Sequence, residues 1–125
     1  MRTIPIKESL TIEFKSDKKK YSDADLVDEI VGMTNTKGGT LYLGLEDNGE
    51  VTGVHPKHKD AIGVTALIAN STVPSVSVRA EVITEEEKDV LKIEIPVDIS
   101  HILGNLITVI FDYQILRKPL KILSL

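Results

Sequence analysis

Apolar and polar residues alternate along residues 9–15 of the chain. A period of two residues is typical of a β-strand with one buried face. We therefore predict a first strand here, whose buried face is formed by Leu10, Ile12 and Phe14. The solvent face of this strand would carry Ser9, Thr11, Glu13 and Lys15.

The spacing of the apolar residues becomes helical over residues 22–36. Ser22 is a suitable N-cap, and Asp23 and Asp25 would place negative charge in the first turn, which the helix dipole favours. The following Gly38-Gly39 pair is expected to end the helix, since glycine readily adopts the left-handed conformation of a C-terminal cap. The buried stripe would comprise Leu26, Val27, Ile30, Val31 and Met33.

A second alternating stretch follows at residues 40–45. Asn48-Gly49 then indicates a tight turn, from which residues 51–54 would return as a short third strand. In the second strand, we expect Leu41, Leu43 and Leu45 to face inward and Tyr42 and Gly44 to face outward.

Pro56 stands near the start of a second predicted helix, at residues 58–71. Residues 75–83 and 90–97 alternate again on either side of a polar segment, which predicts an antiparallel hairpin. The predicted fold class is therefore α/β (α+β), with a mixed sheet, the element order βαββαββ and two helices.

The length of 125 residues suits one compact domain with its own core. We expect this domain to span residues 1–98. The remaining residues 99–125 differ in composition, because only one of the nineteen acidic residues, Asp112, lies there. This apolar and basic tail has three interpretations: a last strand with a basic end, an apolar arm that forms homo-oligomers, or the product of a truncated or frame-shifted reading frame.

The net charge of −4 means that binding to a polyanion would need a local basic patch. The chain has no cysteine, which excludes disulfides and suits a reducing compartment. The N-terminal residues lack the long apolar stretch of a signal peptide. The longest apolar run, around residues 102–111, is too short and too polar to span a bilayer. We therefore expect a cytoplasmic protein that does not enter a membrane.

Acidic residues accompany both of the first two predicted strands. Strands joined through a helix usually run parallel and end at the same edge of a sheet. Glu13 and Lys15 would meet Glu46 and Asp47 there, and gathered carboxylates suit Mg²⁺ or Mn²⁺. Glu8 lies about 16 Å from Glu13 along an extended chain, so it joins this group only if the chain bends before Thr11. The alternative is that these charged side chains only cover a solvent-exposed face of the sheet and form no site.

A basic cluster follows the first strand. Lysine ammonium groups can hold the phosphates of a nucleic acid, and Tyr21, beside the cluster, could stack on a base. The alternative is an ordinary solvated loop, in which lysine is common. The candidate nucleic-acid-binding residues are Lys15, Lys18, Lys19 and Lys20.

Two other kinds of site are disfavoured. A Walker motif requires Gly-Lys-Ser/Thr before a helix, whereas Lys37 precedes the glycines of TNTKGGT and a strand follows. ATP is therefore an improbable cofactor. His55 and His58 have no carboxylate at a spacing that would make a zinc site.

The string Glu8-x-x-x-x-Glu13-Phe14-Lys15, the helix ending in TNTKGG and the segment TLYLGLEDNGEVTGV together resemble the Schlafen AlbA_2 domain. The resemblance covers residues 6–98. It implies a nucleic-acid-binding module of a transcriptional regulator, in a family also labelled a divergent AAA-4-type ATPase-like domain. Relatives that cut RNA with a divalent metal imply catalytic and metal-binding roles for Glu8, Glu13 and Asp47.

Three functional hypotheses follow. The first is a module that binds DNA or RNA through the lysine cluster. The second is a ribonuclease dependent on Mg²⁺ or Mn²⁺, in which Glu8, Glu13 and Asp47 hold the ion. The third is a module that self-associates through residues 99–125. Whether the chain is an enzyme is left open by the sequence.

Overall fold

Four strands form one mixed sheet in the order β1-β2-β4-β3. The computed structural model describes residues 2–97. Strands β1 and β2 are parallel, while β4 runs antiparallel to both of its neighbours. The strands are β1 (Ile12–Lys15), β2 (Gly39–Leu43), β3 (Arg79–Glu85) and β4 (Lys88–Ile95).

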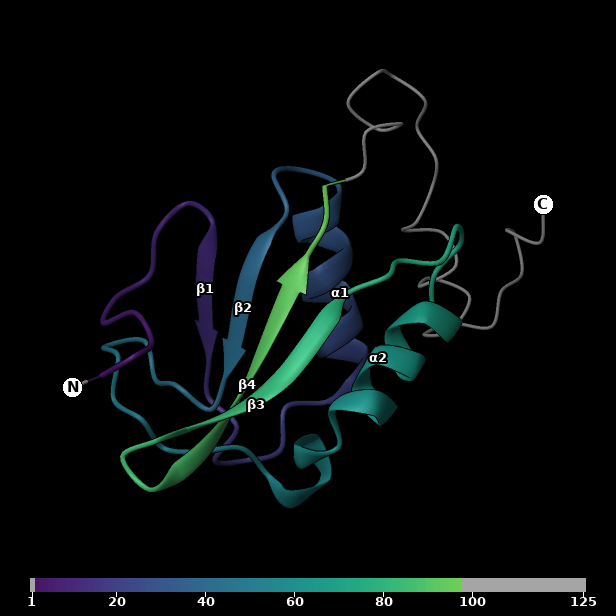
Figure 1. Cartoon of the computed structure of the whole chain (residues 1–125). Helices are drawn as coiled ribbons and strands as arrows, with labels where there is room; N and C mark the ends of the chain where they lie inside the picture. Colours follow the sequence, from purple (N-terminus) through teal and green to yellow (C-terminus); the bar gives the residue numbers. More distant parts are fainter. Residues whose placement is uncertain (1, 98–125) are drawn as a thin grey trace.

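Both α-helices lie on the same face of the sheet (Figure 1). The helices are α1 (Asp23–Thr34), the short 3-10 helix η1 (Pro56–Lys59) and α2 (Ala61–Asn70). A four-stranded mixed sheet with two helices confirms the predicted α+β class. No helix within residues 2–97 is long and apolar enough to cross a membrane.

The boundaries of α1 follow from the capping groups found in the sequence. Ser22 Oγ accepts a hydrogen bond from the backbone N–H of Asp25 at 3.0 Å, as predicted for an N-cap. After the helix, the Gly38 N–H donates to the carbonyl of Met33 at 2.7 Å. Gly39 has φ +127°, and a Cβ there would lie 2.4 Å from the carbonyl oxygen of Thr11. Only glycine therefore lets β2 start so close to β1.

Apolar side chains pack on both faces of the sheet. The helix face holds the larger cluster, in which residues of both helices meet β2 and β4. The opposite face holds a second cluster, made by Ile4, Phe14, Tyr42, Leu45, Val51 and Val90. Because both faces are partly covered, alternation along one strand does not separate buried from exposed side chains.

Two of the predicted strand faces were therefore wrong. Tyr42, expected in solvent, is 6% exposed and meets Phe14 edge to face, with ring centroids 6.1 Å apart. Leu10, expected in the core, is 86% exposed, because the chain turns at residues 9–12 before β1 begins. Leu45 packs on the face opposite Leu41, since Gly44, with φ +106°, interrupts the alternation.

The predicted third strand is reduced to one bridge between Leu45 and Val51. The turn at Asn48-Gly49 does form, with the Gly49 N–H donating to Glu46 at 2.8 Å. Beyond it, the N–H groups of Thr52 and Gly53 both donate to the carbonyl of Gly44, so regular pairing cannot continue. The order βαββαββ thus loses one strand between β2 and η1.

The last hairpin is shifted toward its turn relative to the prediction of strands at residues 75–83 and 90–97. Strands β3 and β4 extend into the polar segment and are joined by Glu86 and Glu87 alone. Both residues have positive φ, 52° and 65°, as a two-residue turn of type I′ requires. Glutamate is an unusual residue for this conformation, which explains why the sequence did not indicate so tight a turn.

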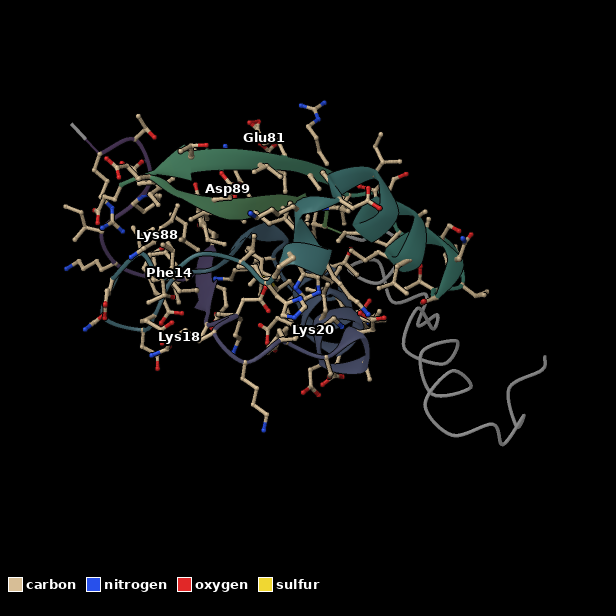
Figure 2. All side chains as sticks on the ribbon, turned by 90° about the horizontal axis from the view of Figure 1, so that it is seen from below. Phe14, Lys18, Lys20, Glu81, Lys88 and Asp89 are labelled. Carbon is tan, nitrogen blue, oxygen red and sulfur yellow. The ribbon has the colours of Figure 1, made fainter. Side chains whose placement is uncertain are left out.

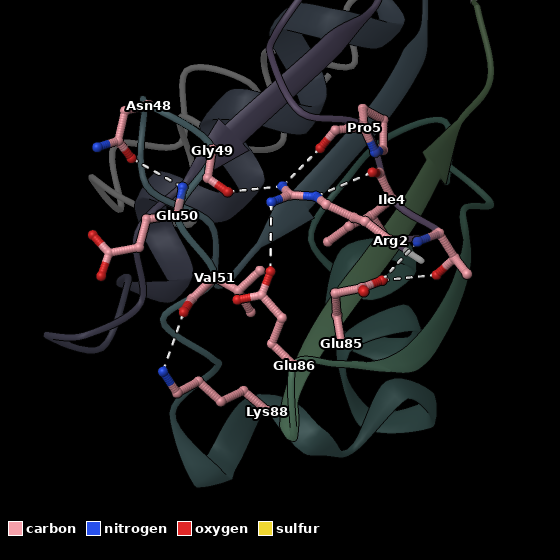
Figure 3. A network of polar contacts seen from close by, with 11 residues as sticks. Arg2, Ile4, Pro5, Asn48, Gly49, Glu50, Val51, Glu85, Glu86 and Lys88 are labelled. Carbon is pink, nitrogen blue, oxygen red and sulfur yellow. Dashed lines mark hydrogen bonds and ion pairs between the residues drawn. The ribbon is translucent and has the colours of Figure 1, made fainter.

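The N-terminal segment is fastened across the second cluster (Figure 3). Arg2 donates to the carbonyls of Pro5 and Gly49 at 2.8 and 2.7 Å, and its guanidinium lies 3.9 Å from Glu86. Glu85 accepts hydrogen bonds from the N–H and hydroxyl of Thr3 at 2.9 and 2.8 Å. These contacts hold the segment that leads into Glu8.

The predicted tail, residues 99–125, and the proposed domain boundary at residue 98 lie outside the described residues.

Candidate functional site

Glu8 and Glu13 lie together, although four residues separate them in the sequence. The chain reverses between Ser9 and Ile12, whose backbone groups bond to each other at 3.0 and 3.4 Å. The reversal carries Glu8 back to β1, where its carboxylate accepts the N–H of Phe14 at 2.7 Å. This is the bend that the sequence analysis required for Glu8 to join Glu13.

Glu13 points to the helix side of the sheet rather than to open solvent. Lys15 lies between two glutamates, with its ammonium 3.8 Å from Glu13 and 3.6 Å from Glu29 of α1. A depression of about 280 Å³ opens beside this group, lined by Glu13, Glu29 and residues such as Leu10 and Met33. We call Glu8, Glu13, Glu29 and Lys15 the glutamate site.

The electrostatics of the glutamate site raise the pKa of Glu13. Burial raises the pKa of Glu13, and the carboxylates of Glu8 and Glu29 raise it further, whereas the Lys15 ammonium acts in the opposite direction. Burial and the same acidic surroundings, Glu29 first among them, raise the pKa of Tyr21 to about 12. The Tyr21 ring packs against the main core, so it is not a free surface for a base.

Asp47 does not lie with Glu8 and Glu13. Glu13 pairs with Leu41 in the sheet, and Asp47 follows Leu41 by six residues, beyond the end of β2. No three histidine, cysteine, aspartate or glutamate side chains in residues 2–97 are placed to hold one metal ion. Glu29, which the sequence did not single out, is the third carboxylate near Glu13.

Glu46, the other acidic residue after β2, instead contacts residues 16–22 between β1 and α1, which we call the lysine loop. Its carboxylate accepts the Thr52 hydroxyl at 2.6 Å and lies 3.9 Å from the ammonium of Lys18. Burial opposes ionisation here, but hydrogen bonds from Thr52 and Ser16, with the charge of Lys18, outweigh it and lower the pKa of Glu46.

The loop between β1 and α1 carries Lys18, Lys19 and Lys20 on the surface. The Lys18 side chain is 64% exposed, and the Lys20 ammonium lies 3.4 Å from Asp23. Lys19 is exposed and has no ion pair within residues 2–97. Lys18 and Lys20 occupy the side of the molecule away from Glu81 (Figure 2). Lys15, predicted to act with these lysines, belongs to the glutamate site.

A buried aspartate that was not predicted from the sequence anchors this loop. Asp17 is 1% exposed and its carboxylate accepts three N–H groups, each at 2.7 Å. The donors are the backbone of Tyr21, the backbone of His55 and Nδ1 of His58. An aspartate within a lysine run gives no sign of burial, and its partners lie 38 and 41 residues away in the sequence.

Comparisons with known proteins place this fold among solved structures. The chain is similar to the DIP2311 protein from Corynebacterium diphtheriae, with 22% identity and a TM-score of 0.56 over 70% of this chain and 20% of that one. It is also similar to the N-terminal domain of a RecG-related protein from Nitrosomonas europaea, named as an ATP-dependent DNA helicase. That match has 20% identity and a TM-score of 0.55, over 75% of this chain and 68% of the other.

The chain therefore spans only a fifth of the DIP2311 protein. No curated protein matches the sequence. The sequence model of the family described as Schlafen, AlbA_2 matches residues 8–110, which begins at Glu8 and includes the whole sheet. The chain belongs to the Schlafen AlbA_2 family, as its motifs around Glu13 and TNTKGG indicated.

Proposed function

We propose that this domain binds nucleic acid through the lysine loop, as a module of a regulatory protein. The observation that carries the proposal is the run of three lysines after β1, with Lys18 and Lys19 exposed and Lys20 half-buried, in a chain of net charge −4. The overall charge repels a polyanion weakly, so local lysines must supply the attraction. The Nitrosomonas europaea neighbour, whose name relates it to the ATP-dependent DNA helicase RecG, supports a partner of this class.

The test is the affinity for labelled duplex DNA and single-stranded RNA at increasing salt. Neutralised phosphates release counterions, so log K should fall linearly with log salt, by about 0.9 per contact on duplex DNA and about 0.7 on single strands. Replacing Lys18, Lys19 and Lys20 by glutamine should remove most of this slope. Lys37→Gln is the matched control, because Lys37 is also exposed but follows the other end of α1. Absence of binding at low salt would refute the proposal.

A ribonuclease is the second candidate, and the meeting of Glu8 with Glu13 favours it. Paired carboxylates, one with a raised pKa, are common where acid–base chemistry occurs. Carboxylates also suit Mg²⁺ or Mn²⁺, but the described residues do not complete a metal site, since Asp47 lies apart from the pair. The role of Asp47 implied by the resemblance therefore remains a prediction.

Cleavage of structured RNA in the presence of Mn²⁺ tests this candidate. Glu13→Gln should abolish cleavage, and equal activity of the variant and the wild type would identify a contaminating nuclease. Comparing Glu29→Gln with Asp47→Asn then decides which third carboxylate matters. Loss of activity with Glu29→Gln alone would assign the cleavage to the glutamate site beside Lys15. Loss with Asp47→Asn alone would support the catalytic role of Asp47 implied by the resemblance.

Self-association through residues 99–125 is the third proposal. Light scattering of the whole chain and of a chain ending at residue 98 tests it, and the same monomer mass for both would reject it.

A further inference from the structure

The buried Asp17 carboxylate joins two surface segments that are distant in the sequence. On one side, it accepts the backbone N–H of Tyr21, which closes the loop containing the three lysines. On the other, it accepts the backbone N–H of His55 and Nδ1 of His58, which fix the start of η1. Both segments lie at the lower end of the sheet in Figure 1, where β1 and β2 end.

The second segment is also basic. Within η1, His58 is 3% exposed and points inward to Asp17. A 3-10 helix has three residues per turn, so Lys57 and Lys59, on either side of His58, project outward. Lys59 lies 3.6 Å from Asp89, whereas Lys57 is exposed and has no ion pair within residues 2–97.

Several acidic groups also lie close to these lysines. Asp17 is buried, whereas Asp60 is exposed and caps α2 by accepting the N–H of Gly63 at 2.9 Å. The partners of the paired lysines are Glu46 for Lys18, Asp23 for Lys20 and Asp89 for Lys59. Each segment also retains one lysine without an ionic partner in residues 2–97, which is Lys19 in the loop and Lys57 in η1. Two unpaired ammonium groups on segments tied by one carboxylate can both contact phosphates of one strand.

We propose that the lysine loop and η1 form one continuous phosphate-binding surface, with Asp17 as the positioning residue that holds its two halves together. This inference rests on the proposed nucleic-acid function and adds a second half, Lys57 and Lys59, that sequence reasoning did not assign. The partner is the sugar-phosphate backbone of DNA or RNA, since these lysines contact charge and not base edges.

Single substitutions separate this inference from the function on which it rests. On labelled duplex DNA, Lys19→Gln and Lys57→Gln should each lower the salt slope by about 0.9, and the double variant by about twice as much. Lys37→Gln should leave it unchanged. If Lys19→Gln weakens binding and Lys57→Gln does not, the second half is refuted and the nucleic-acid function stands. If the wild type does not bind, both fail.

Asp17→Asn tests the positioning role. An amide in place of the carboxylate cannot accept all three N–H groups, so the start of η1 should come free of the loop. In the folded Asp17→Asn protein, Lys57→Gln should no longer change the slope, while Lys19→Gln still does. If both lysines keep their full effects, Asp17 has only a stabilising role and the inference is overturned. If Asp17→Asn fails to fold, the effects of Lys19→Gln and Lys57→Gln on the salt slope decide whether the two segments form one phosphate-binding surface.

Discussion

The carboxylate of Glu8 accepts the backbone N–H of Phe14 at 2.7 Å, across a reversal of the chain. One side chain therefore closes the turn before β1 and also brings its charge to Glu13, the neighbour of Phe14 in the sequence. The same contact stabilises the first strand and destabilises the charged form of Glu13, and the two effects can be separated by substitution.

Glu8→Ala should lower the free energy of unfolding by about 1–2 kcal/mol, since it removes a hydrogen bond to a charged acceptor. Glu8→Gln keeps an acceptor and should cost less. Either substitution should also lower the pKa of Glu13, because the Glu8 carboxylate, which raises that pKa, is absent. Urea unfolding and NMR titration of Glu13 measure these effects. Equal stability of wild type and Glu8→Ala would contradict the contact.

Glu13→Gln should stabilise the protein at neutral pH. A carboxyl whose pKa is raised in the folded state contributes stability below its ordinary pKa of 4.5 and loses it as the pH rises through the folded value. Wild type and variant should therefore be equally stable in acid, below pH 4.5. The variant should be more stable than the wild type once the pH exceeds the folded-state pKa of Glu13. The gain should stay below about 1 kcal/mol, because the Glu13 side chain is partly exposed.

Urea unfolding of both proteins across this pH range measures the difference, which should shrink in a Glu8→Gln background. A wild type more stable than the variant at neutral pH would show that the attraction of Lys15 exceeds the combined effect of burial and the neighbouring carboxylates.

Phe14→Ala should cost about 3–5 kcal/mol, the usual range for a fully buried phenylalanine. Phe14 has no exposed surface and packs against Tyr42 beneath the N-terminal segment. Leu10→Ala is the matched control, because the alternation of residues 9–15 placed both on one buried face. With Leu10 86% exposed, its truncation should change stability by less than about 0.5 kcal/mol. Similar losses of stability for both variants would support the buried strand face that the sequence predicted, with Leu10 and Phe14 side by side.

Glu87→Gly should raise the free energy of unfolding by about 0.5–1 kcal/mol. Glu87 has φ +65°, which glycine adopts without the Cβ clash of other residues. The neighbouring Glu86, although also at positive φ, lies 3.9 Å from Arg2, so Glu86→Gly gives up this ion pair and should gain less. Thermal unfolding compares the two, and a loss of stability for Glu87→Gly would argue against the type I′ turn.

Local signals in the sequence were sufficient for the elements that depend on local chemistry. Ser22 at the start of α1 and Asn48-Gly49 in the turn act through neighbours within a few residues, so their roles were predictable. The parallel pairing of β1 with β2 followed from the connecting helix. These features required no knowledge of the rest of the chain.

The errors arose where distant parts of the chain decide the outcome. Tyr42 is buried because the N-terminal segment, fastened by Arg2, covers the face of the sheet that alternation assigned to solvent. Asp17 and His58 meet only through folding, and a buried hydrogen bond between distant side chains leaves no periodicity in a sequence. In the glutamate site, Glu8 reaches Glu13 only through a turn at Ser9–Ile12 that no glycine or proline marks.

Strand β1 has four residues and one hydrogen-bonded neighbour, since it lies at the edge of the sheet. Edge segments of this kind open and close more readily than a whole domain unfolds. Amide hydrogen exchange should therefore be faster in β1 than in the central strand β4. Each such opening would part Glu8 from the backbone of Phe14, so any ligand held by the two glutamates would also slow the breathing of this edge.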